Sequence, residues 1–317
     1  MSRVLLADIG GTHSRFGLAA GTGRPEQVLA FDNDDFPGLD AAISFYLAEV
    51  KTRPHAAVLA VAGPVNGHEI ALTNRPWRFH LRDLAAQFGL SSIQAINDFE
   101  ALAWALPRLG PDDTRRLGGG DELGASQGAK LVLGPGTGLG VAALVPSGDS
   151  WQSVASEGGH VSFGAESSDE EPVFARLRQH GRVSAETVLS GPGLTRLHAA
   201  LHPGAAPLPP ETIVARAEAG EAAALGTTRL FVRLLGRFAG DVALTFKARG
   251  GVYIAGGVAC GLGPLFDEDV FREAFESHPP YGWLLAAVPT YLVTCMEPGL
   301  IGCAALAEIT ANGFAER

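Results

Sequence analysis

The sequence predicts an α/β protein of two domains, and three observations support this prediction. The chain has 317 residues, a length that suggests two domains or one large α/β unit. Short apolar runs typical of strands alternate with segments whose apolar residues recur at helical spacing. The order apolar run, Gly/Thr turn, apolar run occurs twice, in LLADIGGTHSRFGL and in LVLGPGTGLGVAAL. We therefore expect two corresponding halves, with chance likeness between two Gly-rich hairpins as the alternative.

The first half is predicted to begin with a β-hairpin. Val4 to Ile9 and Phe16 to Ala20 are apolar runs, and Gly10-Gly11-Thr12 forms the turn between them. The other elements predicted for this half are a helix at Pro37 to Val50, strands at Ala56 to Ala62 and Ile93 to Ile96, and a helix at Phe99 to Leu106 that ends before Pro107.

The segment from Gly110 to Gly128 is rich in Gly and Asp, and we expect it to connect the two domains. The elements predicted beyond it are strands at Leu131 to Leu133, Val141 to Val145 and Val252 to Ala255, and a helix that opens at Glu297 to Ala307. The strand at Val252 ends in Gly256-Gly257.

Composition argues against several classes of partner. The net charge is −10 and no basic run occurs, so we expect no nucleic-acid partner. The three cysteines, Cys260, Cys295 and Cys303, form no CxxC pair, which favours reduced thiols. No apolar stretch is long enough for a membrane span, and Asp8 comes too early for a signal peptide. We expect a cytoplasmic protein without a membrane partner.

The two Gly-rich turns have the composition of a phosphate-binding site, because glycines let several backbone N–H groups approach one anion. No Gly-Lys pair occurs, which excludes a Walker loop, and the turn at residues 134–140 lacks the Rossmann spacing. Asp8, at the end of the first strand, is placed to hold a hydrated Mg²⁺ beside the phosphates. Its alternative role is that of an ordinary residue at a strand end.

Polar residues at the predicted strand ends and loops are candidates for chemistry. Asn97 and Asp98 lie where a strand meets a helix; Asp98 is a candidate general base, and Asn97 is either a substrate ligand or the helix cap, with Glu100 completing a capping box. Glu157 and His160 flank two glycines, as substrate ligands or as solvated loop residues. A metal site there is less favoured because no third ligand is close in sequence.

Glu186 follows Ser184, which reads as a helix N-cap. The acid is therefore either a favourable first-turn charge or an acceptor for a substrate hydroxyl. Carboxylates, an amide and an imidazole together suit the directed hydroxyl groups of a neutral polyol. Asn97, Asp98, Glu157, His160 and Glu186 thus point to a sugar-like substrate.

Over nearly its whole length the chain resembles the bacterial glucokinases of the actin, hexokinase and heat-shock ATPase superfamily. The segments that carry the resemblance are LADIGGTHSRFGL, LTNRPWRF, INDFEALAWALP, LGPGTGLGVA, SEGGHVSF, VSAETVLSGPGL, VYIAGGV and EPGLIGCAAL. The resemblance implies an actin-like ATPase fold of the hexokinase type, ribonuclease H-like, with an interdomain cleft. It implies a small domain at residues 1–107, on which a C-terminal helix at 299–317 packs back, and a large domain at 108–298.

The resemblance also implies roles for single residues. Asp98 is the implied base, and Asn97, Glu157, His160 and Glu186 are the implied sugar ligands. The residues implied to contact the ATP phosphates are Gly10, Gly11, Thr12, Gly136, Thr137 and Gly138. Gly256 and Gly257 are implied to lie against the adenosine, and Asp8 to hold Mg²⁺ through water.

The implied reaction is transfer of the γ-phosphoryl group of ATP to the 6-hydroxyl of glucose, with Mg²⁺ as cofactor. A kinase for a related hexose, such as mannose or an amino sugar, and a non-catalytic sugar sensor on the same fold are the alternatives. The resemblance further suggests a homodimer.

Overall fold

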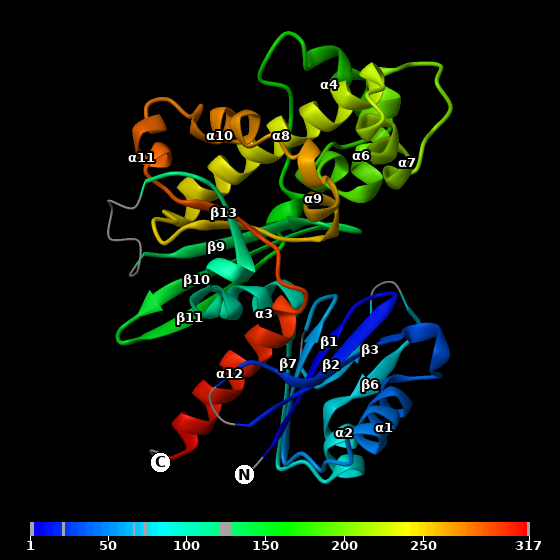
Figure 1. Cartoon of the computed structure of the whole chain (residues 1–317), viewed down its shortest axis with the longest axis vertical. Coiled ribbons are helices and arrows are strands. Elements are labelled where there is room, and N and C mark those ends of the chain that lie inside the picture. Colours follow the sequence, from blue (N-terminus) through cyan, green and yellow to red (C-terminus); the bar gives the residue numbers. More distant parts are fainter. Residues whose placement is uncertain (1–2, 21–22, 66, 73–74, 121–127, 316–317) are drawn as a thin grey trace. The chain divides into compact units, whose positions relative to one another are not determined.

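The computed structural model describes residues 3–315 except 21–22, 66, 73–74 and 121–127 (Figure 1). The chain divides into two compact units. The first consists of residues Met1–Leu109 and Cys295–Arg317, and the second of Gly110–Thr294. None of the helices in this described part of the chain is both long and apolar enough to cross a membrane.

The first unit is built on a five-stranded sheet of order β3-β2-β1-β4-β7. Its strands are β1 (Val4–Ile9), β2 (His13–Ala19), β3 (Glu26–Asp32), β4 (Ala56–Val61) and β7 (Ser92–Asn97), and a separate small hairpin is formed by β5 (Glu69–Ala71) and β6 (Arg78–His80). Strands β1, β2 and β3 pair antiparallel, whereas β1, β4 and β7 run parallel. The carboxyl ends of three strands therefore meet at one edge.

Helices cover the two faces of this sheet. They are α1 (Leu39–Val50), α2 (Leu81–Phe88), α3 (Asp98–Ala105) and α12 (Pro298–Ala315). Leu5, Ala7 and Ile9 of β1 belong to the core that also holds α1 and α2 residues. Because successive strand residues alternate faces, Asp8 points to the opposite side, where α12 packs on β1 and on α3.

The second unit contains a six-stranded sheet of order β11-β10-β9-β12-β13-β8. The strands are β8 (Thr114–Gly118), β9 (Lys130–Pro135), β10 (Leu139–Ser147), β11 (Ser150–Ser156), β12 (Val252–Ile254) and β13 (Thr290–Val293). Its helices are α4 (Glu171–Arg178), α5 (Ala185–Val188), α6 (Gly191–Leu201), α7 (Pro210–Glu218), α8 (Ala222–Phe246), α9 (Gly257–Gly261), α10 (Glu268–Glu276) and α11 (Gly282–Ala286). The long α8 packs against α6, α7 and α10.

The two sheets share a topology. In each, an antiparallel hairpin and a third strand are followed by two parallel strands: β3-β2-β1-β4-β7 corresponds to β11-β10-β9-β12-β13. The predicted hairpins around the two Gly/Thr turns are both confirmed. The corresponding strand orders favour the interpretation of two related halves over chance likeness.

One predicted connection contains regular structure. The segment expected to be a linker, 110–128, includes β8, which pairs antiparallel with β13 at the sheet edge. The strand reads TRRLG, and Leu117 is its one buried apolar side chain. An edge strand of this composition shows no apolar run, so sequence pattern alone could not detect it. Residues 121–127 of this segment lie outside the described part.

Candidate functional site

The turn between β1 and β2 is held by a buried asparagine. Asn33 is 1% exposed; its backbone N–H donates to the carbonyl of Thr12 (2.8 Å) and its side-chain Nδ2 to the carbonyl of Gly10 (2.9 Å). The hydroxyl of Ser14 donates to Asn33 Oδ1 at 2.6 Å, and Arg75 donates to the carbonyl of Gly11 at 3.3 Å. The carbonyl oxygens of Gly10, Gly11 and Thr12 are thus engaged by donors, and the amide of Gly10 donates to the carbonyl of His13 at 3.0 Å. The amides of Gly11 and Thr12 are therefore the ones that can face an anion.

Sequence reasoning identified Gly10, Gly11 and Thr12 but missed Asn33, which is 19 residues from Ser14 along the chain. The run Asp32 to Asp35 reads as a polar turn, and nothing in it distinguishes the buried amide from its exposed neighbours. The hydrogen bonds depend on β3 returning beside β2, which is tertiary information.

Asp8 is partly buried on the side of β1 against which helix α12 packs. Burial raises the pKa of its carboxyl group, and the positive charge of Arg15 opposes that rise. A Cβ added to Gly299, in the first turn of α12, would lie 2.6 Å from Asp8 Oδ2, so a larger residue there would have to displace the carboxylate. A carboxylate near a helix N-terminus is stabilised by the amide dipoles there.

Asp98 begins α3 directly after β7. Burial raises the pKa of its carboxyl group to about 6, and the negative charge of Asp8 adds to the rise. Hydrogen bonds from the amides of Phe99 and Asp98 and from the Asn97 side chain oppose it. A carboxyl group with a pKa near neutral is suited to accept a proton in a reaction.

Asn97 is the N-cap of α3. Its Oδ1 accepts from the amides of Phe99 (2.9 Å) and Glu100 (3.3 Å), and its Nδ2 donates to the carbonyl of Gly63 (3.2 Å). The capping role that the sequence left open for Asn97 is confirmed. Its role as a sugar ligand stays a prediction.

In the second unit, the turn between β9 and β10 is enclosed by glycines. Gly136 donates from its amide to the carbonyl of Gly138 at 2.8 Å, and Gly191 donates to the carbonyl of Gly136 at 2.8 Å. Gly256 has a φ of +90°, and a Cβ there would lie 2.5 Å from the carbonyl of Pro135. The structure therefore brings the predicted turn at Gly136, Thr137 and Gly138 next to the predicted Gly256-Gly257 step.

Glu157, His160 and Glu186 come together in the second unit. His160 Nε2 lies 4.0 Å from Glu157 Oε2, and His160 Nδ1 lies 4.0 Å from Glu186 Oε1. These separations exceed a direct hydrogen bond, so hydroxyl groups of a ligand have unused partners on all three side chains. The side chains are 78%, 58% and 32% exposed in the order Glu157, His160, Glu186.

Glu186 is the most firmly oriented of the three. Its Oε2 accepts from the amide of Leu139 at 2.9 Å, directly after the second Gly-rich turn. Ser184 caps helix α5, as predicted, and accepts from the amide of Thr187 at 3.3 Å. Glu186 therefore occupies the first helical turn and leaves Oε1 for a ligand. The two predicted roles of Glu186 are compatible.

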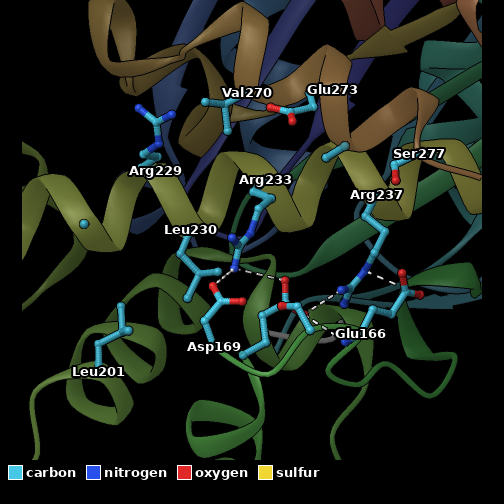
Figure 2. A pocket seen from close by; sticks show the side chains of 14 residues that line it. Glu166, Asp169, Leu201, Arg229, Leu230, Arg233, Arg237, Val270, Glu273 and Ser277 are labelled. Atoms are coloured by element: carbon cyan, nitrogen blue, oxygen red, sulfur yellow. Dashed lines mark hydrogen bonds and ion pairs between the residues drawn. The ribbon is translucent and has the colours of Figure 1, made fainter.

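The segment that follows His160 is fixed by an ion pair that the sequence did not reveal (Figure 2). Arg237 Nη1 on α8 lies 2.6 Å from Glu170 Oε2, and both side chains are buried. The same guanidinium donates to the carbonyl of Gly164 and lies 4.4 Å over the ring of Phe163. Glu170 and Arg237 are 67 residues apart, so no local motif connects them.

The predicted site residues thus form one group in each unit. Asp8, Gly10, Gly11, Thr12, Asn97 and Asp98 belong to the first unit, and Gly136, Thr137, Gly138, Glu157, His160, Glu186, Gly256 and Gly257 to the second. In the first unit they lie at or directly after the carboxyl ends of β1 and β7. In the second unit they lie in the turn after β9, directly after β11, after β12 and on α5. Among the described residues, no group of three or more His, Cys, Asp or Glu side chains could hold a metal ion by itself.

Comparison with known proteins gives a consistent set of similarities. A family model described as Glucokinase matches residues 5–310. A protein of Chelativorans sp. described as a glucokinase is 40% identical over 98% of this chain and 92% of its own length. A bifunctional protein of Burkholderia lata is 42% identical over 97% of this chain, but the match covers 49% of that protein. This chain spans about half the length of such bifunctional relatives.

Solved structures agree with the fold. A glucokinase from an Antarctic psychrotroph superimposes with a TM-score of 0.88 at 34% identity, covering 96% of this chain and 98% of that one. A ROK family glucokinase of Streptomyces griseus, solved with glucose and AMPPNP, gives a TM-score of 0.65 at 22% identity over 96% and 99% of the two chains. At 22% identity, the similarity to the Streptomyces griseus structure shows a shared fold and no more. The predicted mixed α/β fold of the actin-like ATPase class is confirmed by these neighbours.

Proposed function

Because this chain belongs to the glucokinase family, we propose that it transfers the γ-phosphoryl group of ATP to the 6-hydroxyl of glucose, giving glucose 6-phosphate and ADP. The observation that carries the mechanism is the pKa of Asp98, which burial and the charge of Asp8 raise to about 6. A base whose pKa lies near the working pH is mostly ionised and still holds a proton well.

In the proposed reaction Asp98 accepts the proton of the sugar hydroxyl. The hydroxyl oxygen then forms a bond to the γ-phosphorus, and the bond from that phosphorus to the bridging oxygen breaks, which leaves the electron pair on ADP. The protein forms no covalent bond to the substrate in this reaction. Much of the rate enhancement therefore comes from holding the sugar hydroxyl and the γ-phosphate in the correct relative position.

The proposed sugar ligands are Asn97, Glu157, His160 and Glu186. His160 supports the proposal because it lies 4.0 Å from Glu157 and 4.0 Å from Glu186, so these side chains make no direct hydrogen bond to one another through His160. Glu186 Oε1, Glu157 and His160 are therefore available to ring hydroxyls, whereas Glu186 Oε2 accepts from the amide of Leu139. Hydrogen bonds to charged groups are worth on the order of 1.5 to 3 kcal/mol each. Three such partners give a site that distinguishes the orientation of single hydroxyl groups.

The proposed nucleotide ligands are the two Gly-rich turns. Gly10, Gly11 and Thr12 in the first unit and Gly136, Thr137 and Gly138 in the second would hold the phosphates, with Gly256 and Gly257 beside the adenosine. Support comes from the first turn, where Asn33 and Arg75 engage the carbonyl oxygens, and from the second, where Gly256 packs on Pro135.

Asp8 fits the proposed magnesium site. Mg²⁺ is usually held by one or two carboxylates together with water and substrate phosphates, so an isolated carboxylate beside a phosphate-binding turn is sufficient. When bound, the ion would neutralise charge on the phosphate oxygens. Asp8 would hold it through water, as its burial against α12 suggests.

A coupled assay for ADP across a panel of hexoses tests the proposal. We expect turnover with glucose and ATP, and lower kcat/KM with mannose and glucosamine. A preference for one of those sugars would assign the chain to the related hexose kinases. Sugar binding without turnover would identify a sensor and overturn the catalytic role of Asp98. Gel filtration with light scattering tests the homodimer, and fractionation of cells tests the cytoplasmic location.

A further inference from the structure

A cavity lies in the unit formed by residues 110–294, between helices α4, α5 and α6. Its volume is about 540 Å³, within the range of small-molecule sites. The lining residues are Arg176, Leu177, Gln179, His180, Arg182, Glu186, Thr187, Arg196, Ala199 and Ala200. Glu186 is the one carboxylate among them.

The three arginines of this cavity donate to neutral groups. Arg176 donates to the carbonyl of Ala200 (2.9 Å), Arg196 to the carbonyl of Thr187 (3.3 Å), and Arg182 to the hydroxyl of Ser162 (3.1 Å). Within the described part of the chain none of the three lies within 4.0 Å of a carboxylate oxygen.

Other arginines in this unit behave differently. Arg178, next along α4, pairs with Glu171, and Arg233 lies 2.8 Å from Asp169. The protein as a whole carries a net charge of −10. Three arginines without a carboxylate partner around one cavity therefore concentrate positive charge where the surrounding protein is acidic, and such a concentration attracts anions.

We propose that this cavity binds a small organic phosphate monoester. Guanidinium groups match the oxygen geometry of a phosphate dianion and are weakly hydrated, so they release water readily. Leu177, Ala199 and Ala200 supply apolar walls, and Gln179 and Thr187 supply polar atoms for a carbon skeleton with hydroxyl groups. The cavity exceeds what inorganic phosphate alone would fill.

The position of this cavity connects it to the proposed sugar site. Glu186 lines it, and Arg182 donates to Ser162, two residues after His160. A bound phosphate that pairs with Arg182 would break the hydrogen bond from Arg182 to the hydroxyl of Ser162. The binding proposal does not depend on the proposed function, because it rests on the cavity and its charges.

Calorimetric titration with glycerol 3-phosphate, inorganic phosphate and glycerol tests the proposal. The informative variant is Arg176→Gln with Arg196→Gln, which removes two positive charges and spares Arg182. The matched control is Arg178→Gln, on the same helix but not part of the cavity lining. Each variant is first compared with the wild type by circular dichroism and by thermal unfolding.

We expect glycerol 3-phosphate to bind the wild type and Arg178→Gln alike and to bind the double variant more weakly, on the order of tenfold to a hundredfold. Glycerol should not bind, and inorganic phosphate should bind less tightly than the monoester. Unchanged binding to the double variant would place the phosphate elsewhere, for example on the Gly-rich turns, and would overturn the proposal. So would the absence of binding to the wild type. If the double variant does not fold, the two single variants replace it.

Discussion

Asp8 raises the pKa of Asp98. Asp8 lies on β1 and Asp98 begins α3 directly after β7, in a sheet where β1, β4 and β7 run parallel, and the negative charge of Asp8 adds to the effect of burial on Asp98. Burial also raises the pKa of Asp8 itself, whereas the positive charge of Arg15 lowers it. The carboxylate that we propose to hold Mg²⁺ thus also raises the pKa of the proposed base.

The first prediction concerns pH. Because Asp98 must be ionised to accept a proton, kcat/KM for glucose should fall about tenfold per pH unit below the pKa of about 6 and should level off above it. Steady-state rates between pH 4.5 and 8 measure this profile, with the coupling enzymes in excess at each pH. Replacing Asp8 by Asn should lower the apparent pKa of the activity. A flat profile through pH 6 would contradict the assignment.

The second prediction concerns the variant Asp98→Asn, which keeps the shape of the side chain. Turnover should fall by roughly 10² to 10⁴ because the proton acceptor is lost. An exposed carboxylate, Asp40→Asn on α1, serves as the control and should retain full activity. Near-normal turnover in folded Asp98→Asn would remove Asp98 from the mechanism.

The same variant should be more stable than the wild type at neutral pH. The pKa of Asp98 is higher in the folded protein than in the unfolded chain, so its favourable contribution is complete at acid pH and is lost as the pH rises through about 6. Asp98→Asn avoids the cost of burying the charge, which is at most about 3 kcal/mol for a shift of this size. Urea unfolding at pH 5 and pH 8 measures the free energy of unfolding of the variant and of the wild type. The variant should be more stable at pH 8, and the difference should be smaller at pH 5.

Local patterns predicted most of the elements around the site. Strand β1 and the Gly-rich turn after it were predicted because apolar runs and glycines are contiguous in sequence. Ser184 was predicted as a helix cap for the same reason, and capping was one of two roles predicted for Asn97, since a cap and its amides are within three residues. Contiguous signals of this kind also located the second hairpin.

Contacts between distant segments could not be predicted in this way. Asn33 reads as a turn residue, although it is buried against the first Gly-rich turn. Gly299 reads as a helix-opening glycine, and its proximity to Asp8 depends on α12 returning to the first unit. The pKa of Asp98 depends on the same packing. The sequence therefore predicted which residues have suitable chemistry, and the structure supplies what orients them.

The third prediction concerns the support of the first Gly-rich turn. Asn33→Ala removes the donor to Gly10 and leaves the hydroxyl of Ser14 without its acceptor, at a cost of about 1 to 3 kcal/mol. The KM for ATP should rise severalfold while the KM for glucose changes little, because the turn is proposed to bind phosphate only. Ser44→Ala, which loses a hydroxyl bonded within α1, is the control. Equal rises in both KM values would indicate a general loss of structure.

The fourth prediction concerns the sugar ligands. Glu157→Gln, His160→Ala and Glu186→Gln should each weaken glucose binding by about tenfold to a hundredfold and leave ATP binding nearly unchanged. Calorimetry with glucose and with AMPPNP separates the two. Glu171→Gln removes a surface carboxylate paired with Arg178 and should change neither affinity. If glucose affinity were unaffected in all three variants, the sugar site would have to lie elsewhere.

The fifth prediction concerns the buried pair of Arg237 and Glu170. Arg237→Met removes the closer of two guanidinium groups from the buried carboxylate of Glu170 and leaves Arg233 Nη2 at 3.2 Å from Oε1. Breaking a buried ion pair outright costs about 3 to 5 kcal/mol, so we expect a loss of stability below that range. Replacing both residues by Met should recover much of that stability, because two apolar side chains need no partner. Urea unfolding of the two single variants and the double variant gives the coupling free energy.

In the double variant of Arg237 and Glu170, restored stability should not fully restore glucose binding. Arg237 also donates to the carbonyl of Gly164 and lies over Phe163, so it fixes the segment that follows His160. The double variant loses that support even when its stability returns. We therefore expect a raised KM for glucose in the double variant with an unchanged KM for ATP. A double variant with normal stability and a normal KM for glucose would show that the ion pair holds the fold without positioning the sugar ligands.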